Sequence, residues 1–247
     1  MRIGIIGGSG LDDPNILEST RDLELDTPYG PPNSTLRQGK IGGKDVVLLA
    51  RHGRSHTATP TNVNYRANIH ALKAVGCAAV LATTAVGSLR QEIHRGDLVI
   101  LDQFIDFTRR RVPTFYERFE PHNPAHTPMA DPFSEPLREL LIAACRGHGY
   151  RFHERGTVVT IEGPRFSTRA ESNMFRAFGA DVINMSIATE CALAAEAGLP
   201  YAAVAMSTDY DCWKTDEPPV NWQEIVTIFN ENAERVTNVL VDVIKAM

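Results

Sequence analysis

The sequence predicts a single α/β domain, and three observations support this fold class. Segments with strand character alternate with segments of helical character along the whole chain, without an internal repeat. The 247 residues suit one large α/β domain or two small ones, and no change in composition marks a linker. Hydrophobic residues make up 43% of the chain, which is ample for a core. We therefore expect one domain over residues 1–247.

The expected strands are short apolar runs. The clearest is the run at 201–208, which is continuous, rich in small apolar residues and preceded by Pro200. Such a run predicts a strand that is buried on both faces of a sheet. In chain order, the expected strands cover residues 2–6, 45–51, 79–84, 97–102, 156–160, 181–184 and 201–208.

The expected helices cover residues 64–75, 135–148, 168–178, 189–197 and 221–246. The last of these has apolar residues at helical spacing, and Asn221 and Glu224 open it with the spacing of a capping box. Residues 107–132 contain five prolines and predict a long irregular excursion. Loops of this length in compact domains are usually functional or lie at a subunit contact.

Composition excludes several classes of protein. A net charge of −5 and a pI near 5.9 argue against nucleic acid or an anionic membrane as the main partner. The only dense basic run, at 109–111, is interpreted as a solvated loop. We find no signal-peptide pattern and no apolar stretch of 18 residues, so we expect a cytoplasmic protein. The four cysteines are sparse and lack metal-like spacing, which predicts reduced thiols and no metal site.

Two carboxylates, Asp209 and Asp211, follow the apolar run at 201–208. They lie at the carboxyl end of the expected strand, where open α/β sheets collect their ligands. A carboxylate accepts hydrogen bonds, and a protonated carboxyl can also donate one. A 6-aminopurine needs both, because its exocyclic amine donates and its ring N7 must receive a proton. For an isolated Asp-x-Asp, however, an exposed acidic loop is the more common explanation.

Three groups of hydrogen-bond donors also follow expected strands. Ser9 lies in the glycine loop at 7–10 after the first strand, Arg51 and His52 lie at the end of the second, and residues 83–88 lie at the end of the third. The glycine loop lacks the G-x-G-x-x-G spacing of a dinucleotide site, so a loop that presents N–H groups to one phosphate fits better. Each group alone has a structural explanation: Arg51 could form a surface ion pair, and the threonines could be ordinary strand residues. Together they favour inorganic phosphate as a ligand.

Taken together, these segments resemble the purine nucleoside phosphorylase family, specifically its 5′-methylthioadenosine phosphorylase branch. The motifs occur in the family's order over nearly the whole chain. They are residues 4–13, 49–54, 63–68, 84–90, 161–167 and 182–186, followed by the acidic turn. The resemblance implies a central mixed twisted β-sheet flanked by helices. It also implies reversible phosphorolysis of a glycosidic bond, with inorganic phosphate as a co-substrate and no cofactor.

The resemblance also implies roles for individual residues. Phosphate should be held by Ser9, Arg51, His52, Thr84, Ala85 and Ser186. The base and the ribose should be contacted by Phe166, Asn184, Met185, Asp209 and Asp211. Because burial and a neighbouring carboxylate raise a carboxyl pKa, Asp209 is the expected proton donor to N7, with Asp211 supporting the turn or the amine. Relatives that cleave 6-oxopurine nucleosides have asparagine at the first position, so Asp209 favours 6-amino bases.

The expected pocket for the 5′ substituent consists of His126, Ser167, Trp222 and Ile225. Ile225 offers only apolar surface, which suits a methylthio group. His126 matches a residue that the family donates across a subunit boundary, so we expect a homotrimer or a dimer of trimers. Three features depart from the family pattern: Ser186 replaces a threonine, no proline precedes Glu190, and the chain stops at Met247, before the C-terminal helix that covers a neighbour's pocket in relatives. The early end of the chain predicts that a 5′-methylthio group is preferred to a 5′-hydroxyl by a modest factor and not exclusively.

Several other functions remain open at this point. The nearest are a 6-oxopurine nucleoside phosphorylase, a methylthioinosine phosphorylase and a broader adenosine phosphorylase. From other classes, the chain could be a non-catalytic nucleoside-binding protein or a dinucleotide-dependent oxidoreductase. Phosphate-dependent release of a purine would separate the first group from both of these.

Overall fold

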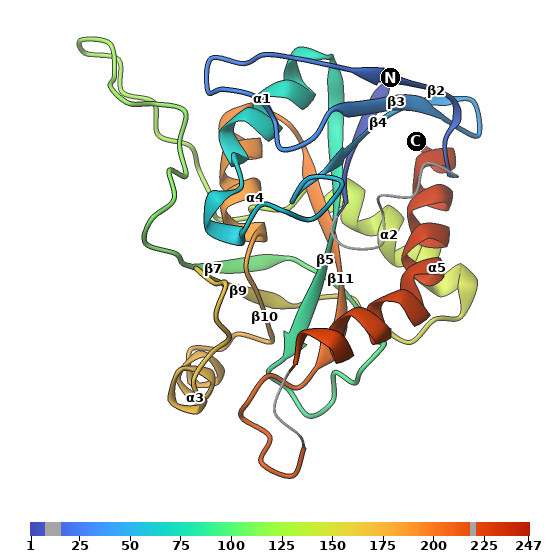
Figure 1. Cartoon of the computed structure of the whole chain (residues 1–247), viewed down its shortest axis with the longest axis vertical. Coiled ribbons are helices and arrows are strands. Elements are labelled where there is room, and N and C mark those ends of the chain that lie inside the picture. The colour runs from blue at the N-terminus through green and yellow to red at the C-terminus, as the bar shows by residue number, and fades with distance from the viewer. Residues whose placement is uncertain (8–15, 218–220) are drawn as a thin grey trace.

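The computed structural model describes residues 1–7, 16–217 and 221–247, and they form one mixed β-sheet covered by helices (Figure 1). Over these residues the sheet has 11 strands, in the order β2-β3-β4-β1-β5-β10-β9-β7, while β11 pairs with β5 and β6, and β8 with β6. The strands are β1 (Arg2–Gly7), β2 (Glu18–Leu23), β3 (Leu36–Ile41), β4 (Lys44–Ala50), β5 (Cys77–Ser88), β6 (Leu98–Ile100), β7 (Gln103–Phe107), β8 (Phe152–His153), β9 (Thr157–Ile161), β10 (Val182–Asn184) and β11 (Tyr201–Asp209). The predicted fold class is confirmed.

Strand β5 is the branch point of the sheet. Its first half pairs in parallel with β1 on one side, and most of its length pairs in parallel with β11 on the other. Its last residues, Gly87 and Ser88, pair antiparallel with β10 instead of β1. The sheet therefore divides at the carboxyl end of β5, with one branch continuing through β10, β9 and β7.

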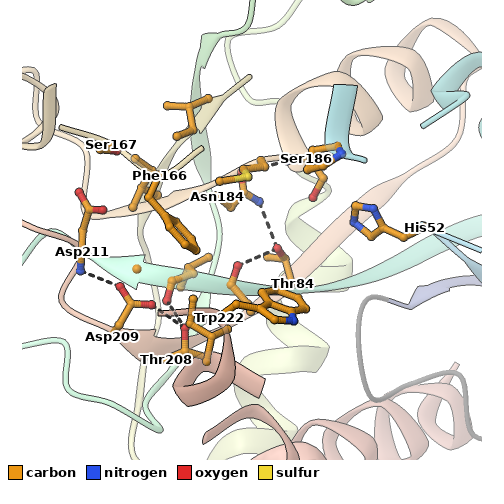
Figure 2. Close-up of a pocket in the computed structure, with 18 of the residues that line it drawn as sticks. His52, Thr84, Phe166, Ser167, Asn184, Ser186, Thr208, Asp209, Asp211 and Trp222 are labelled. Atoms are coloured by element: carbon orange, nitrogen blue, oxygen red, sulfur yellow. Dashed lines mark hydrogen bonds between the residues drawn. The ribbon is translucent and has the colours of Figure 1, made fainter. Parts of the chain in front are cut away.

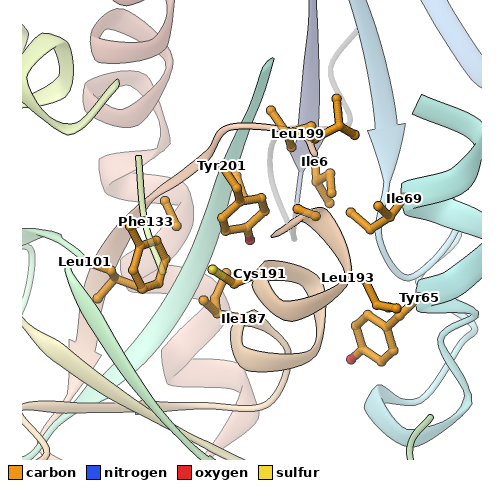
Figure 3. Close-up of a cluster of buried hydrophobic side chains, with 14 of the residues drawn as sticks. Ile6, Tyr65, Ile69, Leu101, Phe133, Ile187, Cys191, Leu193, Leu199 and Tyr201 are labelled. Carbon is orange, nitrogen blue, oxygen red and sulfur yellow. The ribbon is translucent and has the colours of Figure 1, made fainter. Parts of the chain in front are cut away.

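The two faces of the β5–β11 pair are covered by different helices (Figure 1). Helices α1 (Tyr65–Ala74) and α4 (Ile187–Glu196) pack on one face, in the cluster of Figure 3. Helices α2 (Glu135–His148) and α5 (Trp222–Ala246) pack on the other face. Successive residues of β11, such as Ala203 and Val204, point to opposite faces of the sheet and belong to different cores. Both faces of this strand are buried, as its continuous apolar run predicts.

All seven predicted strands and all five predicted helices are present, with small shifts at their ends. The remaining helix is α3 (Arg169–Ala177), and a reciprocal capping box between Thr168 and Glu171 opens it. At α5, Asn221 accepts a hydrogen bond from the Glu224 N–H, so the predicted N-cap is correct. The Glu224 carboxylate, however, accepts from the Asn221 side chain and from Arg95.

Four strands were missed: β2, β3, β7 and β8. The β2 segment, Glu-Ser-Thr-Arg-Asp-Leu, is exposed along almost its whole length and has no apolar alternation to reveal it. It pairs with β3 through the backbone and through ion pairs such as Arg37–Asp22. Strand β8 has only two residues and β7 is an edge strand that leads into the irregular excursion. Strand β7 pairs with β9 and β8 pairs with β6, both distant in the sequence, whereas β3 was missed although it forms a hairpin with the next strand, β4.

The excursion at 107–132 is irregular after the end of β7, as predicted, and projects from the body of the molecule (Figure 1). It is anchored near its base by Arg111, whose side chain is almost fully buried. The Arg111 guanidinium donates to the Glu162 carbonyl oxygen at 2.9 Å and to the Tyr65 hydroxyl at 3.1 Å. Arg111 was interpreted as part of a solvated loop, and this interpretation is wrong for that residue.

Candidate active site

One pocket gathers nearly all of the predicted site residues. It lies where the carboxyl ends of β4, β5 and β11 meet the end of β10, the loop after β9 and the first turn of α5 (Figure 2). Parallel strands place their carboxyl ends at one edge of the sheet, which explains why segments far apart in sequence meet here. The predicted residues that line it are Arg51, His52, Thr84, Ala85, Phe166, Ser167, Asn184, Met185, Ser186, Asp209, Asp211, Trp222 and Ile225.

Asp209 and Asp211 form the acidic end of the pocket. Asp209 is 7% exposed, and its two oxygens accept hydrogen bonds from the Asp211 N–H at 2.7 Å and the Thr208 hydroxyl at 2.8 Å. Asp211 has a positive φ of 49°, which folds the turn back toward Asp209. The exposed acidic loop considered as an alternative is therefore wrong, because both carboxylates are buried.

Burial decides the charge of these two carboxylates. Burial raises the pKa of the Asp209 carboxyl to about 6, while its hydrogen bonds from Thr208 and Asp211 oppose this shift. Burial likewise raises the pKa of Asp211 above its ordinary value. With a pKa of about 6, the Asp209 carboxyl holds a proton in roughly a tenth of the molecules at pH 7, far more often than an ordinary aspartate. This end of the pocket can therefore both donate a proton and accept hydrogen bonds.

Gly87 makes room for the acidic turn. A Cβ atom at this position would lie 2.9 Å from an Asp209 oxygen and 3.0 Å from the Ile183 side chain. A side chain at Gly87 would therefore push the carboxylates away from β5. Sequence reasoning included this glycine in a motif and assigned it no role, because the close approach depends on the pairing of β5 with β11.

A polar chain of hydrogen bonds crosses the middle of the pocket. The Thr160 hydroxyl donates to the Asn184 side-chain oxygen at 2.8 Å, and the Asn184 amide donates to the Thr84 hydroxyl at 3.2 Å. These contacts orient Asn184 and leave Thr84 facing the cavity (Figure 2). Phe166, on the loop after β9, points into the same space. Met185 also lines the pocket, and its carbonyl oxygen accepts from the Tyr65 hydroxyl at 3.3 Å.

The opposite end of the pocket suits an anion. Arg51 is 1% exposed, and its guanidinium contacts the Glu190 carboxylate through Nε and Nη2 and the Thr83 carbonyl oxygen through Nη1. The surface ion pair considered for Arg51 is therefore wrong, because the pair is buried. Ser186 is the N-cap residue of α4, makes no side-chain capping bond and lines the pocket, so the N-terminus of α4 borders the pocket. Helix N-termini favour negative charge.

His52 has a defined tautomer at this end. Its Nδ1 lies 2.9 Å from the Ala58 carbonyl oxygen, which can only accept, so Nδ1 carries the proton. Burial, followed by the neighbouring Arg51 guanidinium, lowers the pKa of His52 to about 4. In the neutral ring Nε2 is an acceptor, which suits the hydroxyl of a phosphate monoanion. A bound dianion would instead favour protonation of Nε2.

The apolar end near α5 differs in part from the prediction. Trp222 and Ile225 lie on the first turn of α5, and Trp222 is 52% exposed. The ring of His56, a lining residue that sequence reasoning missed, lies 5.5 Å from the Trp222 ring. Ser167 was expected here but lies on the Asp211 side, where its carbonyl oxygen accepts from the Cys212 thiol (Figure 2).

Two predicted residues are not seen in this pocket. Ser9 lies outside the residues that the structure describes. His126 is exposed on the excursion, with its ring 5.4 Å from that of Phe119, and does not line the pocket of its own chain. Within the described ranges, no group of three or more His, Cys, Asp or Glu side chains could hold a metal ion. The same ranges contain no helix that is both long and apolar enough to cross a membrane.

Comparison with known proteins identifies the family. A model of the phosphorylase superfamily matches residues 2–245. The chain belongs to this superfamily. The S-methyl-5′-thioadenosine phosphorylase of Danio rerio is 56% identical over 247 residues, which are 99% of this chain and 88% of that protein. The protein of the same name from Anopheles gambiae is 53% identical over 245 residues, with the same shares of the two chains.

Solved structures of the superfamily agree with this fold. A methylthioadenosine phosphorylase from Schistosoma mansoni in complex with adenine is 41% identical, with a TM-score of 0.94. A variant of the adenosine/methylthioadenosine phosphorylase of the same organism, in complex with methylthioadenosine, is 40% identical, with a TM-score of 0.93. Each match covers 100% of this chain and 91% of the other. The resemblance deduced from the sequence motifs is confirmed.

The Asp209 carboxyl should lower stability at alkaline pH. Its pKa is about 6 in the folded protein against an ordinary value of 3.8, so the folded state binds this proton more tightly than the unfolded chain. The stabilising contribution is thus full below pH 3.8 and is lost as the pH rises through 6. Asp209→Asn, which keeps an acceptor for the Asp211 N–H, should raise the free energy of unfolding at pH 8 by about 2–3 kcal/mol, at ~1.4 kcal/mol per pKa unit. Urea denaturation at pH 4.5 and pH 8 measures this difference.

The matched control is Asp131→Asn, at an exposed carboxylate outside the pocket. This variant should show no comparable difference between the two pH values. An equal gain for Asp209→Asn at both pH values would mean that the Asp209 carboxylate is not destabilised by burial.

Proposed function

We propose that the protein catalyses the reversible, phosphate-dependent cleavage of 5′-methylthioadenosine to adenine and 5-methylthioribose 1-phosphate. The observation that carries this proposal is the arrangement of one pocket with a protonatable buried carboxyl at one end and anion-binding groups at the other. Its relatives named S-methyl-5′-thioadenosine phosphorylase support the choice of substrate. The protein is accordingly a pentosyltransferase.

The proposed reaction is a substitution at C1′ of the ribose. The C1′–N9 bond breaks with its electron pair going to the purine, and a phosphate oxygen forms the new bond to C1′. The sugar passes through a state with oxocarbenium character, which the phosphate stabilises electrostatically. The Asp209 carboxyl gives its proton to N7, so that adenine leaves as a neutral base. Inorganic phosphate is a co-substrate, and no step requires a cofactor.

The positions of the side chains support the following roles. Arg51, Thr84, Ala85, Ser186 and, from the sequence resemblance, Ser9 hold phosphate, with His52 beside them. Asn184, Met185 and Phe166 enclose the ribose and the base, and Asp209 and Asp211 face the N7 edge of the purine. We place Ser167 with the base instead of the 5′ substituent, because it lies beside Asp211.

The proposed setting is the reducing cytoplasm, where the products can re-enter purine and methionine salvage. All four cysteines are free thiols, and burial raises the pKa of Cys77 and of Cys145 to about 12. Such thiols are neutral and unreactive near neutral pH. The acidic net charge also supports the absence of a nucleic-acid or membrane partner.

Release of adenine should require phosphate. Wild-type protein incubated with methylthioadenosine should yield adenine and a sugar 1-phosphate when phosphate is present and neither product when it is absent, as followed by chromatography. Adenine release in phosphate-free buffer would identify a hydrolase, and binding without turnover would identify a nucleoside-binding protein.

Methylthioinosine serves as the control substrate, because its 6-oxo group accepts a hydrogen bond where the acidic turn requires a donor. Equal turnover of both substrates would favour the 6-oxopurine alternative.

A methylthio group should be preferred to a hydroxyl at the 5′ position, by a modest factor. Burying the group against Ile225 contributes roughly 1–2 kcal/mol, whereas a hydroxyl finds no partner on that side chain. Because Trp222 is half-exposed, the hydroxyl can keep contact with water, which reduces its penalty. The ratio of kcat/KM for methylthioadenosine and adenosine measures this preference. Ile225→His should narrow or invert it, with Ile225→Val as the apolar control. A wild-type ratio at or below one would change the proposed substrate to adenosine.

The functional unit should be a homotrimer or a pair of trimers. The proposal rests on His126, which is exposed on a projecting excursion and matches a residue that the family donates to a neighbour's site. Light scattering should give three or six times the 27.2 kDa of the chain. His126→Ala should lower kcat/KM for methylthioadenosine without changing the assembly, while His122→Ala, on the same excursion, should leave both unchanged. A fully active monomer would refute this assignment.

A further inference from the structure

Glu190 is a buried carboxylate that the proposed reaction does not use directly. It lies on the first turn of α4, is 0% exposed and does not line the pocket. Its oxygens accept two hydrogen bonds from the Arg51 guanidinium, through Nε and Nη2. The Tyr201 hydroxyl, at the start of β11, donates to the same carboxylate at 2.8 Å. Among the described residues, the hydrogen bonds of the Glu190 carboxylate therefore either join it to Arg51 or support that contact.

Arg51 is held on three of its five N–H groups. Two bind Glu190 and a third, on Nη1, donates to the Thr83 carbonyl oxygen at 2.9 Å. A guanidinium has five N–H donors in a planar fork, so one donor on Nη1 and one on Nη2 have no partner among the residues that the structure describes. Arg51 itself lines the pocket beside Thr84 and Ser186. The two remaining donors are thus available at the anion end, in an orientation that Glu190 and Thr83 determine.

A buried ion pair is a weak source of stability. Removing both charges from water costs about as much as their attraction returns, and well-packed apolar residues often do as well. Arg51, Glu190 and Tyr201 come from the end of β4, from α4 and from β11, so the pair brings three distant segments to one point. The presence of the Arg51–Glu190 ion pair is therefore better explained by the position in which it holds the guanidinium than by a gain in stability.

We propose that Glu190 is a positioning residue, which with the Tyr201 hydroxyl holds the Arg51 guanidinium so that its two remaining N–H groups contact phosphate. This inference rests on the proposed phosphorolysis. Because the Glu190 charge cancels that of Arg51, the pair itself is neutral. Phosphate affinity then depends on directed hydrogen bonds, to which a charged guanidinium in a defined geometry contributes strongly.

The direction in which Glu190→Gln changes the KM for phosphate distinguishes positioning of Arg51 from an effect of charge alone. Glu190→Gln removes a negative charge near the anion, so an effect of charge alone would lower the KM for phosphate. Loss of positioning would raise it, because the amide can accept from only one of the two Arg51 donors. We expect the KM for phosphate to rise about tenfold or more, and the KM for methylthioadenosine to change less than about threefold. An unchanged or lower KM for phosphate would overturn the proposal.

A second variant keeps the test decisive if Glu190→Gln does not fold. Tyr201→Phe removes only the hydroxyl that supports Glu190, and should raise the KM for phosphate by a smaller factor, about threefold. An unchanged value would again overturn the proposal. The matched control is Asp97→Asn, at another buried carboxylate that pairs with an arginine, Arg151, outside the pocket. It should lower the melting temperature without altering the KM for phosphate.

Ligand-induced thermal shifts give a readout without turnover. Phosphate should raise the Tm of the wild type and of Asp97→Asn, and should raise that of Glu190→Gln much less, while adenine should stabilise all three. Failure of the wild type to respond to phosphate, together with phosphate-independent adenine release, would refute the proposed function itself. A normal wild-type response combined with a normal response of Glu190→Gln would refute only the role of Glu190.

Discussion

The parallel pairing of β5 with β11 determines where both ends of the pocket lie. In this register Ala205 lies opposite Thr84 and Asp209 lies opposite Gly87. Thr84 lines the pocket and is one of the proposed phosphate ligands, and Gly87 leaves the space that the Asp209 carboxylate occupies. A shift of register by one residue would turn every side chain of β11 to the other face. Apolar packing on both faces prevents this shift, so the two cores also fix the distance between the anion and the acid.

Burial has opposite consequences at the two ends. At the acidic end, no cationic side chain of the described ranges hydrogen-bonds Asp209, and burial raises its pKa toward neutrality. At the anion end, Arg51 is buried more completely but keeps its charge, because the Glu190 carboxylate contacts it directly. Asp209 can therefore change its protonation state near neutral pH, and Arg51 cannot. A reaction that needs both a proton donor and a permanent anion site requires this difference in local environment.

The sequence predicted the frame of the molecule and most of the pocket, for a physical reason. Strands such as β11 and helices such as α5 carry their own apolar pattern, and parallel strands must place their following loops at one edge of the sheet. The position of Asp209 near Thr84 follows from these two facts. The environment of Arg51 did not follow, because the partner Glu190 is 139 residues away and its motif gave no sign of burial. The same limit explains why His56, Gly87 and the position of Ser167 were missed.

The excursion is joined to the pocket more closely than its projecting shape indicates. Arg111 holds the base of the excursion against the Tyr65 hydroxyl and the Glu162 backbone, with its guanidinium 5.0 Å from the Tyr65 ring centre. The same Tyr65 hydroxyl contacts the Met185 carbonyl oxygen, and Met185 lines the pocket. Further along, the Glu196 carboxylate at the end of α4 accepts the Phe115 N–H at 2.7 Å. The excursion is thus tied to the helix that carries Ser186 and Glu190. The excursion therefore shares hydrogen-bonded contacts with Met185, which lines the pocket, and with the helix that begins at the anion end.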